Sequence, residues 1–230
     1  MCGRFTLRTS AADVAAALDV PSLPLFEPRY NIAPTQNVAV VRQTDDAPRE
    51  CLPMRWGLVP SWAENPAIGN KLLNARSETA AQKPSFRQAF KRRRCLIPAD
   101  GFYEWQKQGR QKQPFYIHRA DDRPFALAGL WEHWDKSDQV LLSCTILTTS
   151  ANGLMAQLHD RMPVILGPDD YAQWLDPAQD SADVLQPLLR PCPDDWLAAY
   201  PVSTEVNNPR HQGPELIEPA EPPPSQQALF

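Results

Sequence analysis

A chain of 230 residues is long enough for one large domain or two small ones. Its hydrophobic fraction of 43% and charged fraction of 22% are typical of a soluble globular protein, and no apolar run approaches the ~20 residues of a membrane span. The net charge of −4 conceals a basic stretch, because residues 71–119 hold twelve Lys and Arg against three Asp and Glu. Such a segment favours a polyanionic partner, although the run Lys91–Arg94 is equally explained by a solvated helix face.

The predicted elements of the first half begin with a short helix, because Ser10 followed by Asp13 indicates an N-cap and an acidic first turn. Phe86 and Phe90 are four residues apart, which predicts a later helix with its arginines on the opposite face. The predicted elements are, in chain order, a helix over 11–19, an irregular proline-rich stretch over 21–36, strands over 37–43 and 50–59, a surface loop over 60–70 and a helix over 84–94.

The second half of the chain is predicted to be richer in strands. Its predicted elements are strands over 95–100, 101–106, 113–119, 125–134 and 140–149, a short helix over 151–159, a returning strand over 162–166, helices over 169–175 and 182–189, and a last strand over 196–203. This spacing indicates an antiparallel meander or a barrel-like sheet. We therefore expect the α+β class: a single domain over residues 1–219 with a barrel-like, mostly antiparallel β core flanked by short helices, and a disordered proline-rich tail over residues 220–230.

Cysteine usage and the N-terminus indicate a reducing compartment. The five cysteines are dispersed and odd in number, with no C-x-x-C pair, which argues against disulfides and zinc. Cys51, Cys95 and Cys144 lie among apolar residues and are predicted to be buried thiols. No signal peptide is apparent, so we expect a cytoplasmic protein. Because the histidines lack metal-ligand spacing and no glycine-rich phosphate loop occurs, we expect neither a metal nor another cofactor.

Cys2 directly follows the initiator methionine in the opening MCGRF. Once Met1 is removed, Cys2 carries an amine and a thiol on adjacent carbons, and an α-amine with a pKa of ~7.7–8.0 is partly neutral and nucleophilic at neutral pH. With an aldehyde, the amine forms an imine and the thiol can close a thiazolidine ring. An ordinary early residue behind a retained Met1 is the competing interpretation, and it leaves Cys2 without a free amine.

Three further segments carry candidate chemistry. Asn74 can donate and accept hydrogen bonds, and Arg76 in the same NARSET segment is a potential bidentate phosphate ligand. Glu104 lies between two aromatic residues in GFYEW and is suited to general acid–base work. His159 in LHDRMP can shuttle protons. A polar turn, a solvated strand position and a structural histidine are the respective alternatives, and most of the seven tryptophans are equally explained as core residues.

Seven motifs in order resemble the SRAP family, the SOS response-associated peptidase-like proteins that process abasic sites in DNA. They are MCGRF, RYNIAPTQ, RWGLVPSW, NARSET, CLIPADGFYEW, HDRMPVIL and QGPELIEP, and they span residues 1–219. The resemblance implies a single α+β domain with a barrel-like β core and a positively charged groove for single-stranded DNA. It also implies that the mature terminal cysteine captures the aldehyde of the ring-opened abasic deoxyribose as a stable thiazolidine.

The resemblance assigns roles by motif. For catalysis it implies Cys2 as the nucleophile through amine and thiol, Asn74 to orient the reacting groups, Glu104 as the acid/base and His159 as the proton shuttle. For DNA it implies phosphate contacts by Arg4, Arg76 and Arg161, base contacts by Pro34, Trp62 and Trp105, and a further contact at Thr148. Binding of this kind is expected to depend on salt and to be largely independent of sequence.

Two other functions remain open at this point. Cys2 with Glu104 and His159 could support a cysteine peptidase or an autoprotease that removes Met1. The chain could also be a non-catalytic single-stranded DNA binder. Cleavage of the abasic strand by β-elimination is a further expected side activity. The expected partner is single-stranded DNA with abasic sites, without a membrane or a metal, and the protein is expected to be a monomer, nucleoid-associated if its source is bacterial.

Overall fold

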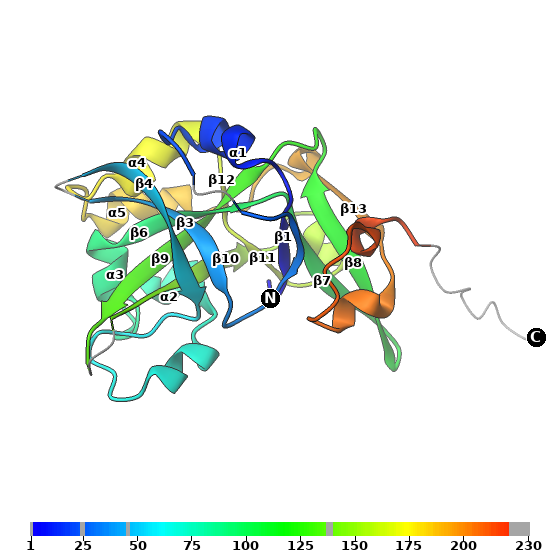
Figure 1. The fold of residues 1–230 in the computed structure, drawn as a ribbon, viewed down its shortest axis with the longest axis horizontal. Helices are drawn as coiled ribbons and strands as arrows, with labels where there is room; N and C mark the ends of the chain where they lie inside the picture. The colour runs from blue at the N-terminus through cyan, green and yellow to red at the C-terminus, as the bar shows by residue number, and fades with distance from the viewer. Residues whose placement is uncertain (1, 24–25, 45–46, 137–139, 221–230) are drawn as a thin grey trace, which may run out of the picture.

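The larger of two sheets closes on itself to form a barrel. The computed structural model describes residues 2–23, 26–44, 47–136 and 140–220 (Figure 1). In the larger sheet, β10 pairs with both β4 and β9, so the order β10-β4-β3-β6-β9 returns to β10. The strands of this sheet are β3 (Asn37–Thr44), β4 (Ala47–Trp56), β5 (Asn74–Arg76), β6 (Arg94–Ala99), β9 (Phe125–Trp134), β10 (Leu141–Ser150), β11 (Arg161–Pro163) and β12 (Ile165–Leu166).

Most neighbouring strands of this ring are antiparallel, and β10 is parallel to β4 and β5. The predicted α+β fold with a barrel-like, mostly antiparallel core is therefore confirmed. Because the ring is closed, each of its five strands has a paired neighbour on both sides.

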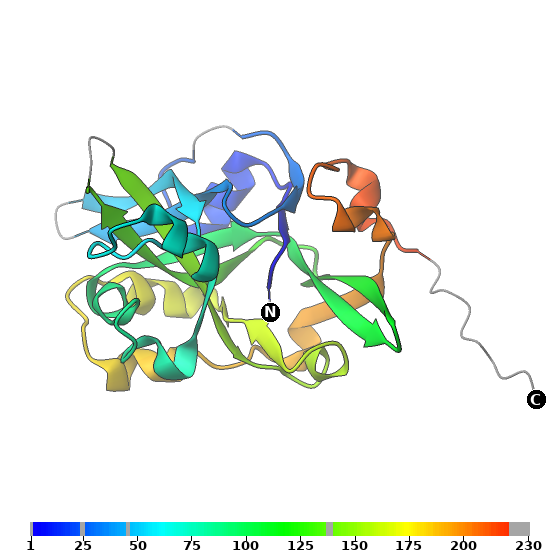
Figure 2. The ribbon, with the colours of Figure 1, turned by 90° about the horizontal axis from the view of Figure 1, so that it is seen from below.

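The smaller sheet carries the beginning of the chain. Its strands, in spatial order, are β13 (Leu197–Pro201), β8 (Gln111–Arg119), β7 (Gly101–Gln108), β1 (Phe5–Leu7) and β2 (Arg29–Ile32). Phe5 of β1 pairs with Ile32 on one side and with Phe102 on the other. Figure 2 shows the blue segment that leads into β1 running through the middle of the molecule, between the barrel and the β7–β8 hairpin. Cys2 and the residues that follow it therefore lie inside the fold.

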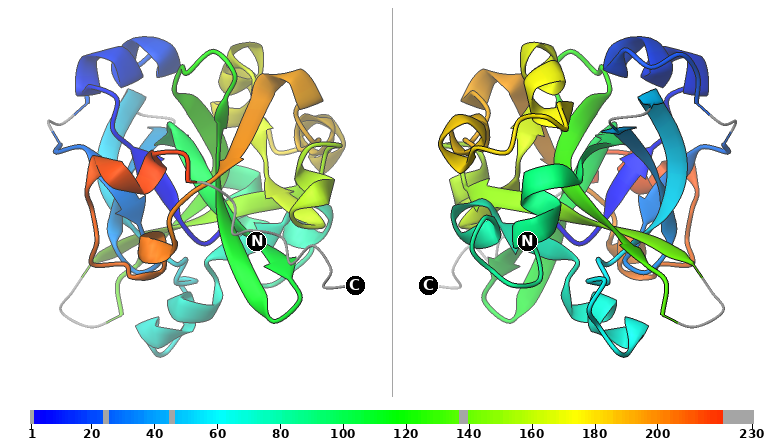
Figure 3. Two further views of the ribbon diagram at one scale, coloured as in Figure 1. Left: turned by 90° about the vertical axis from the view of Figure 1, so that its right-hand side faces the viewer. Right: turned by 90° about the vertical axis from the view of Figure 1, so that its left-hand side faces the viewer.

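Short helices cover the ends of the barrel. They are α1 (Ala11–Leu18), α2 (Ser77–Ala80), α3 (Arg87–Arg92), α4 (Tyr171–Leu175) and α5 (Ala182–Leu185). Short 3-10 turns are η1 (Pro66–Lys71), η2 (Met155–Gln157), η3 (Pro168–Asp170), η4 (Gln186–Leu188), η5 (Asp194–Trp196), η6 (Thr204–Asn207) and η7 (Pro214–Ile217). The predicted N-cap is confirmed, because the Ser10 hydroxyl accepts from Asp13 N over 3.2 Å. Figure 3 shows α1, in dark blue, at the end of the molecule opposite to the cyan turn η1.

Several predicted boundaries were wrong. The proline-rich stretch predicted to be irregular contains β2, which tertiary pairing with β1 makes extended. The strand predicted over 50–59 ends at Trp56, because Gly57 adopts a φ of 128° that extended backbone does not. The loop predicted over 60–70 contains η1, whose first turn is capped by the Asn65 side chain.

Two further corrections concern residues 151–166. The helix predicted over 151–159 is reduced to the turn η2, in which the Asn152 side chain accepts from Met155 N. The strand predicted over 162–166 is divided at Val164. This residue donates to Leu147 O of β10 and accepts from Ala128 N of β9, so the chain changes its strand partner there. The tail predicted over 220–230 lies, apart from Ala220, outside the described residues, as does Met1.

The basic run Lys91–Arg94 is not a uniformly solvated helix face. Arg94 is buried and donates to the carbonyl oxygens of four residues, Phe90, Lys91, Trp174 and Asp176. Burial lowers the pKa of Arg94 to about 10. Arg93 pairs with the buried Glu132 over 2.9 Å. Part of the positive charge of residues 71–119 therefore serves the fold itself.

The cysteines are free thiols. Cys95 and Cys144 are buried as predicted, and burial raises the pKa of each thiol. Cys51 was also predicted to be buried but is only half-buried, because its side of β4 borders a surface pocket with Leu52 and Pro53. Cys192, which was not predicted to be buried, is covered as well.

Candidate active site

Cys2 lies within the hydrophobic core at the entrance to β1. Its side chain is fully buried, and its main-chain carbonyl accepts from Asn74 Nδ2 over 2.9 Å. Burial, and then the negative charge of Glu104, raise the pKa of the Cys2 thiol to about 12. The thiol is therefore protonated at neutral pH, and Glu104 lies near enough to act on it electrostatically. The structure thus brings Cys2, Asn74 and Glu104 together from three distant segments.

Asn74 is positioned by the short strand β5. Asn74 pairs with Ile146 of β10 in parallel register, and Leu73 O accepts from both Ile146 N and Trp56 Nε1. Within the described part of the chain, Asn74 Oδ1 is buried and has no hydrogen-bond partner. Buried polar atoms are almost always paired in native structures. An unpaired acceptor beside Cys2 therefore suits a donor that arrives with the substrate or with a free terminal amine.

Glu104 reaches the same place from β7. The ladder between β1 and β7 extends to a bond from Tyr103 N to Arg4 O over 3.0 Å, so Glu104 lies beside the first residues of the chain. Its carboxylate is buried, and Oε1 accepts from Trp105 N over 3.1 Å. A buried carboxylate next to a thiol can take up and return a proton.

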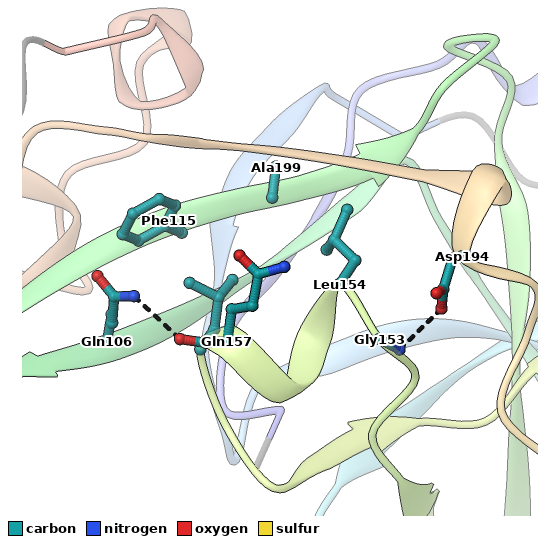
Figure 4. Close-up of a pocket in the computed structure, with 8 residues that line it drawn as sticks. Gln106, Phe115, Gly153, Leu154, Gln157, Asp194 and Ala199 are labelled. Atoms are coloured by element: carbon teal, nitrogen blue, oxygen red, sulfur yellow. Dashed lines mark hydrogen bonds between the residues drawn. The ribbon is translucent and has the colours of Figure 1, made fainter.

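His159 follows η2, and its neighbour Leu158 lies at the face of the smaller sheet that carries Glu104 and Phe115. Its Nδ1 accepts from Arg161 N over 2.9 Å, which assigns the ring proton of the neutral form to Nε2. The Asp160 carboxylate is 2.8 Å from the same Nδ1. A bond from Gln106 Nε2 to Gln157 O, 2.9 Å long, ties the turn before His159 to the strand that carries Glu104 (Figure 4).

Arg161, Thr148 and Arg76 are brought together by strand register. On β10, Thr148 lies opposite Arg76 of β5, and Ser150 lies opposite Arg161 of β11. Arg161 donates to Thr148 O over 2.6 Å and to both carboxylate oxygens of Glu78. Hydrogen bonding from Arg161 lowers the pKa of Glu78. Arg76 is exposed, whereas the Thr148 side chain is buried and Arg161 is held by protein partners.

Arg4 and Trp105 meet at the turn η6. Arg4 donates to Asn31 Oδ1 over 2.7 Å and to Val206 O over 2.8 Å, and Trp105 Nε1 donates to Asn207 Oδ1 over 2.7 Å. Burial lowers the pKa of Arg4. Arg4 therefore fixes the turn η6 against the first residues of the chain. A guanidinium group that contacts a phosphate from this position would do so while it also donates to Asn31 and Val206.

Pro34 and Trp62 lie on connections that leave the barrel. Pro34 and Thr35 form the turn between β2 and β3, in which Gln36 N donates to Ala33 O. Thr35 has a φ of 72°, rare for a β-branched residue, and the bond from Thr35 N to Trp56 O, 2.9 Å long, holds it there. Trp62 is 53% exposed, an unusual position for a large apolar ring.

Sequence reasoning missed four residues that organise the site: Asn31, Glu78, Gln106 and Asn207. Asn31 and Glu78 lie inside the motifs RYNIAPTQ and NARSET, which was the only available signal for them. Asn207 has no such signal, because its contacts to Arg4 and Trp105 span about half the chain or more.

The described residues show no cluster of three or more His, Cys, Asp and Glu side chains placed to hold a metal ion. In the same part of the chain, no helix has both the length and the apolar composition that a membrane crossing requires.

The barrel, the buried N-terminal segment and the polar groups around Cys2 define a class of protein with known members. Residues 1–209 match the family described as SOS response associated peptidase (SRAP), and the chain belongs to this family.

The chain is 44% identical over 223 residues to the abasic site processing protein YoqW of Bacillus subtilis, which covers 95% of this chain and 99% of that protein. It is 34% identical over 230 residues to the abasic site processing protein YedK of Escherichia coli, covering 95% of this chain and 100% of YedK. Among solved structures, a protein from Bacteroides thetaiotaomicron aligns with a TM-score of 0.84 at 26% identity, covering 96% of this chain and 100% of that one.

Proposed function

We propose that this protein processes abasic sites by binding single-stranded DNA and linking Cys2 covalently to the ring-opened abasic deoxyribose. The observation that carries the proposal is the placement of a core cysteine near the start of the chain between the unpaired amide oxygen of Asn74 and the carboxylate of Glu104. The proposal requires removal of Met1, which lies outside the described residues. Relatives that carry the name abasic site processing protein support it.

The chemistry is a condensation of an aminothiol with an aldehyde. The α-amine of Cys2 attacks the aldehyde carbon, and the resulting carbinolamine loses water to give an imine once its hydroxyl is protonated. Sγ then adds to the imine carbon, its proton passes to nitrogen, and a thiazolidine ring closes. The balance is one aldehyde and one aminothiol giving one thiazolidine and one water, without an oxidant or a reductant.

The residues around Cys2 fit these proton transfers. Glu104 protonates the leaving hydroxyl and receives the thiol proton, which a protonated thiol must lose as it adds. Asn74 Oδ1 accepts from the amine or from a sugar hydroxyl, and so orients the attack. His159 moves protons at the sugar, and the imine stage also permits strand cleavage by β-elimination as a side reaction.

Phosphate and base contacts come from the rim of the site. Arg76 is exposed and contacts a phosphate directly, whereas Arg4 and Arg161 present guanidinium groups already held by protein carbonyls and carboxylates. Trp62 provides an exposed stacking face, and Pro34 and Trp105 support neighbouring bases. We expect such binding to weaken with salt.

The buried surroundings of the Cys2 thiol, next to the carboxylate of Glu104, favour aldehyde capture over peptide hydrolysis. A cysteine peptidase needs a thiolate near neutral pH, which a positive neighbour usually stabilises. In the chain that retains Met1, burial and Glu104 act in the opposite direction and raise the pKa of the thiol to about 12, whereas the α-ammonium group of a mature Cys2 lowers it. Addition to an imine can use the protonated thiol with Glu104 as the base, so it does not need a free thiolate.

The proposal is tested with protein whose N-terminus has been read by mass spectrometry. Incubation with a single-stranded oligonucleotide containing one abasic site should give a band that survives a denaturing gel. Cys2→Ser keeps the amine, so it should give only a link that borohydride traps, and Cys51→Ser should behave as the wild type. A persistent crosslink in Cys2→Ala, or none from wild type with a free Cys2 amine, contradicts the proposal.

A further inference from the structure

A concave site lies next to the proposed active site, on the face of the smaller sheet that carries Glu104. It has a volume of about 590 Å³ and is lined by Gln106, Phe115, Gly153, Leu154, Gln157, Leu158, Asp194 and Ala199. Figure 4 shows Phe115 and Ala199 on the strand side and Leu154 and Gln157 on the turn opposite, with Gln106 at one end and Asp194 at the other. Pockets of this size commonly hold small organic groups.

Strand register makes this pocket a neighbour of Glu104. Glu104 of β7 lies directly opposite Phe115 of β8, so the two side chains share a face of the sheet with Cβ atoms about 5 Å apart. Gln106, two residues along β7, points to the same face. On the opposite wall, Leu158 immediately precedes His159. A group attached one nucleotide away from a sugar held at Glu104 and His159 is therefore within reach of the pocket.

The lining selects against phosphate and for a flat, polar-edged group. Among the described residues that line it there is no Lys or Arg, and Asp194 contributes negative charge. Phe115, Leu154 and Leu158 offer apolar faces, and Figure 4 shows the side-chain amide of Gln157 directed across the pocket towards the strand of Ala199. An aromatic face with amide and carboxylate edges is the chemistry that recognises a nucleobase.

Asp194 gives the pocket a preference among bases. Its Oδ1 accepts from Gly153 N over 2.8 Å, which fixes the carboxylate at the end of the pocket. A carboxylate accepts hydrogen bonds and cannot donate them, so it favours a base with an exocyclic amino group over one with a carbonyl at that position.

We propose that this pocket binds an amino-bearing nucleobase, and that its occupant is the base of a nucleotide adjacent to the abasic residue. The inference deepens the proposed function and rests on it for the presence of DNA at the site.

Cytosine and uracil make a sharp pair of probes, because cytosine presents an amino group beside an N3 acceptor where uracil presents a carbonyl beside an N3–H donor. With an abasic oligonucleotide whose neighbour is dC or dU, on the 5′ or the 3′ side, we expect crosslinking about five-fold faster with dC on one side, the effect of one hydrogen bond. Asp194→Asn keeps an acceptor for Gly153 N but can present an N–H to the pocket, so it should abolish or reverse the preference. Asp195→Asn is the matched control, since this exposed neighbour does not line the pocket.

A second measurement separates this inference from the proposed function. Fluorescence anisotropy of intact oligo-dC and oligo-dU with the Cys2→Ala protein needs no crosslink and should show the same preference, removed by Asp194→Asn. Free deoxycytidine in excess should occupy the pocket and so remove the preference for oligo-dC. If only the free nucleoside shows a preference, the pocket does not bind a base of the DNA strand and the inference is overturned. Equal behaviour of dC and dU in both assays overturns the inference even if crosslinking occurs. A dC preference in binding without any crosslink leaves it standing and contradicts the proposed function alone.

Discussion

Asn74 holds Cys2 by its main chain and leaves the thiol unengaged by the amide. The amide nitrogen of Asn74 donates to the Cys2 carbonyl oxygen over 2.9 Å, while Asn74 Oδ1 stays buried without a hydrogen-bond partner among the described residues. The amide therefore fixes the direction in which the Cys2 amine and side chain leave the main chain. Its oxygen remains available beside them as a hydrogen-bond acceptor.

Removing this amide should slow capture more than it weakens the fold. For Asn74→Ala we expect the crosslinking rate to fall about 10- to 100-fold, because an orienting group and an acceptor are both lost. Quenched time courses on an abasic oligonucleotide measure the rate. Asn37→Ala, a change of the same type at an exposed strand position, should crosslink as the wild type does. Equal rates for Asn74→Ala and Asn37→Ala would exclude an orienting role.

The reactivity of the Cys2 thiol should depend on Glu104. Because the negative charge of Glu104 contributes to the raised pKa of Cys2, Glu104→Gln should lower that pKa and increase the thiolate fraction. We expect alkylation of Cys2 by iodoacetamide at about pH 8 to accelerate several-fold in this variant. Peptide mass spectrometry follows the labelled residue, and Glu215→Gln at an exposed position serves as the control. Slower labelling in Glu104→Gln would contradict the electrostatic contact.

The same pKa shift predicts a loss of stability at alkaline pH. In the chain that retains Met1, the Cys2 pKa is about 12 in the folded protein against an ordinary value of 9.0, so the neutral buried thiol stabilises the fold below about pH 9. That contribution disappears as the pH rises from about 9 towards 12, because the unfolded chain ionises first. Thermal melts should therefore fall less steeply with pH in Cys2→Ser than in wild type. Parallel curves for the two proteins would show that Cys2 does not titrate in this way.

Arg76 and Arg87 should differ in their effect on DNA binding although both are exposed. Arg76 lies on β5 beside Asn74, and Arg87 lies on α3. Arg76→Gln should weaken single-strand binding at every sequence and reduce the slope of log K against log salt by about 0.7, the value for one lost phosphate contact. Arg87→Gln should leave the slope unchanged. Anisotropy titrations at several salt concentrations measure both slopes. Equal slopes for the two variants would show that the DNA-binding surface does not include Arg76.

Arg94 should matter for stability and leave the DNA interaction alone. Its guanidinium is buried against four carbonyl oxygens, so Arg94→Gln leaves acceptors unpaired and should lower the free energy of unfolding by about 2–4 kcal/mol. Lys91→Gln, at an exposed position of the same basic run, should change it by less than about 0.5 kcal/mol. Urea unfolding measures both, and similar stabilities would contradict the structural role of Arg94.

Local patterns predicted the regular elements that carry their own signals. The Ser10 cap and the β-branched strand β3 are both present, and the succession of short strands indicated the barrel. Boundaries failed where tertiary contacts decide them. Examples are β2, which is extended because it pairs with β1, and Val164, where the chain changes partner between β10 and β9.

The candidate site was predictable as a set of residues only through the ordered motifs. No periodicity marks a strand as short as β5, so the register that brings Asn74 to Cys2 depends on β10. The contacts that hold Arg4 and Trp105 come from Asn207 and its neighbours, far away in the chain. Long-range contacts of this kind leave no local trace in composition or spacing.

Cys2 can become buried only after a large part of the chain has been synthesised. Phe5 and Thr6 complete their pairing only with Phe102 and Gly101, so the start of the chain cannot dock until about one hundred further residues have been made. At about 5–20 residues per second, that interval lasts roughly 5–20 s. An external aminopeptidase has access to Met1 during this interval, before β1 and β7 enclose Cys2. Under the proposed function, we therefore expect Met1 to be removed most efficiently while the chain is still being translated.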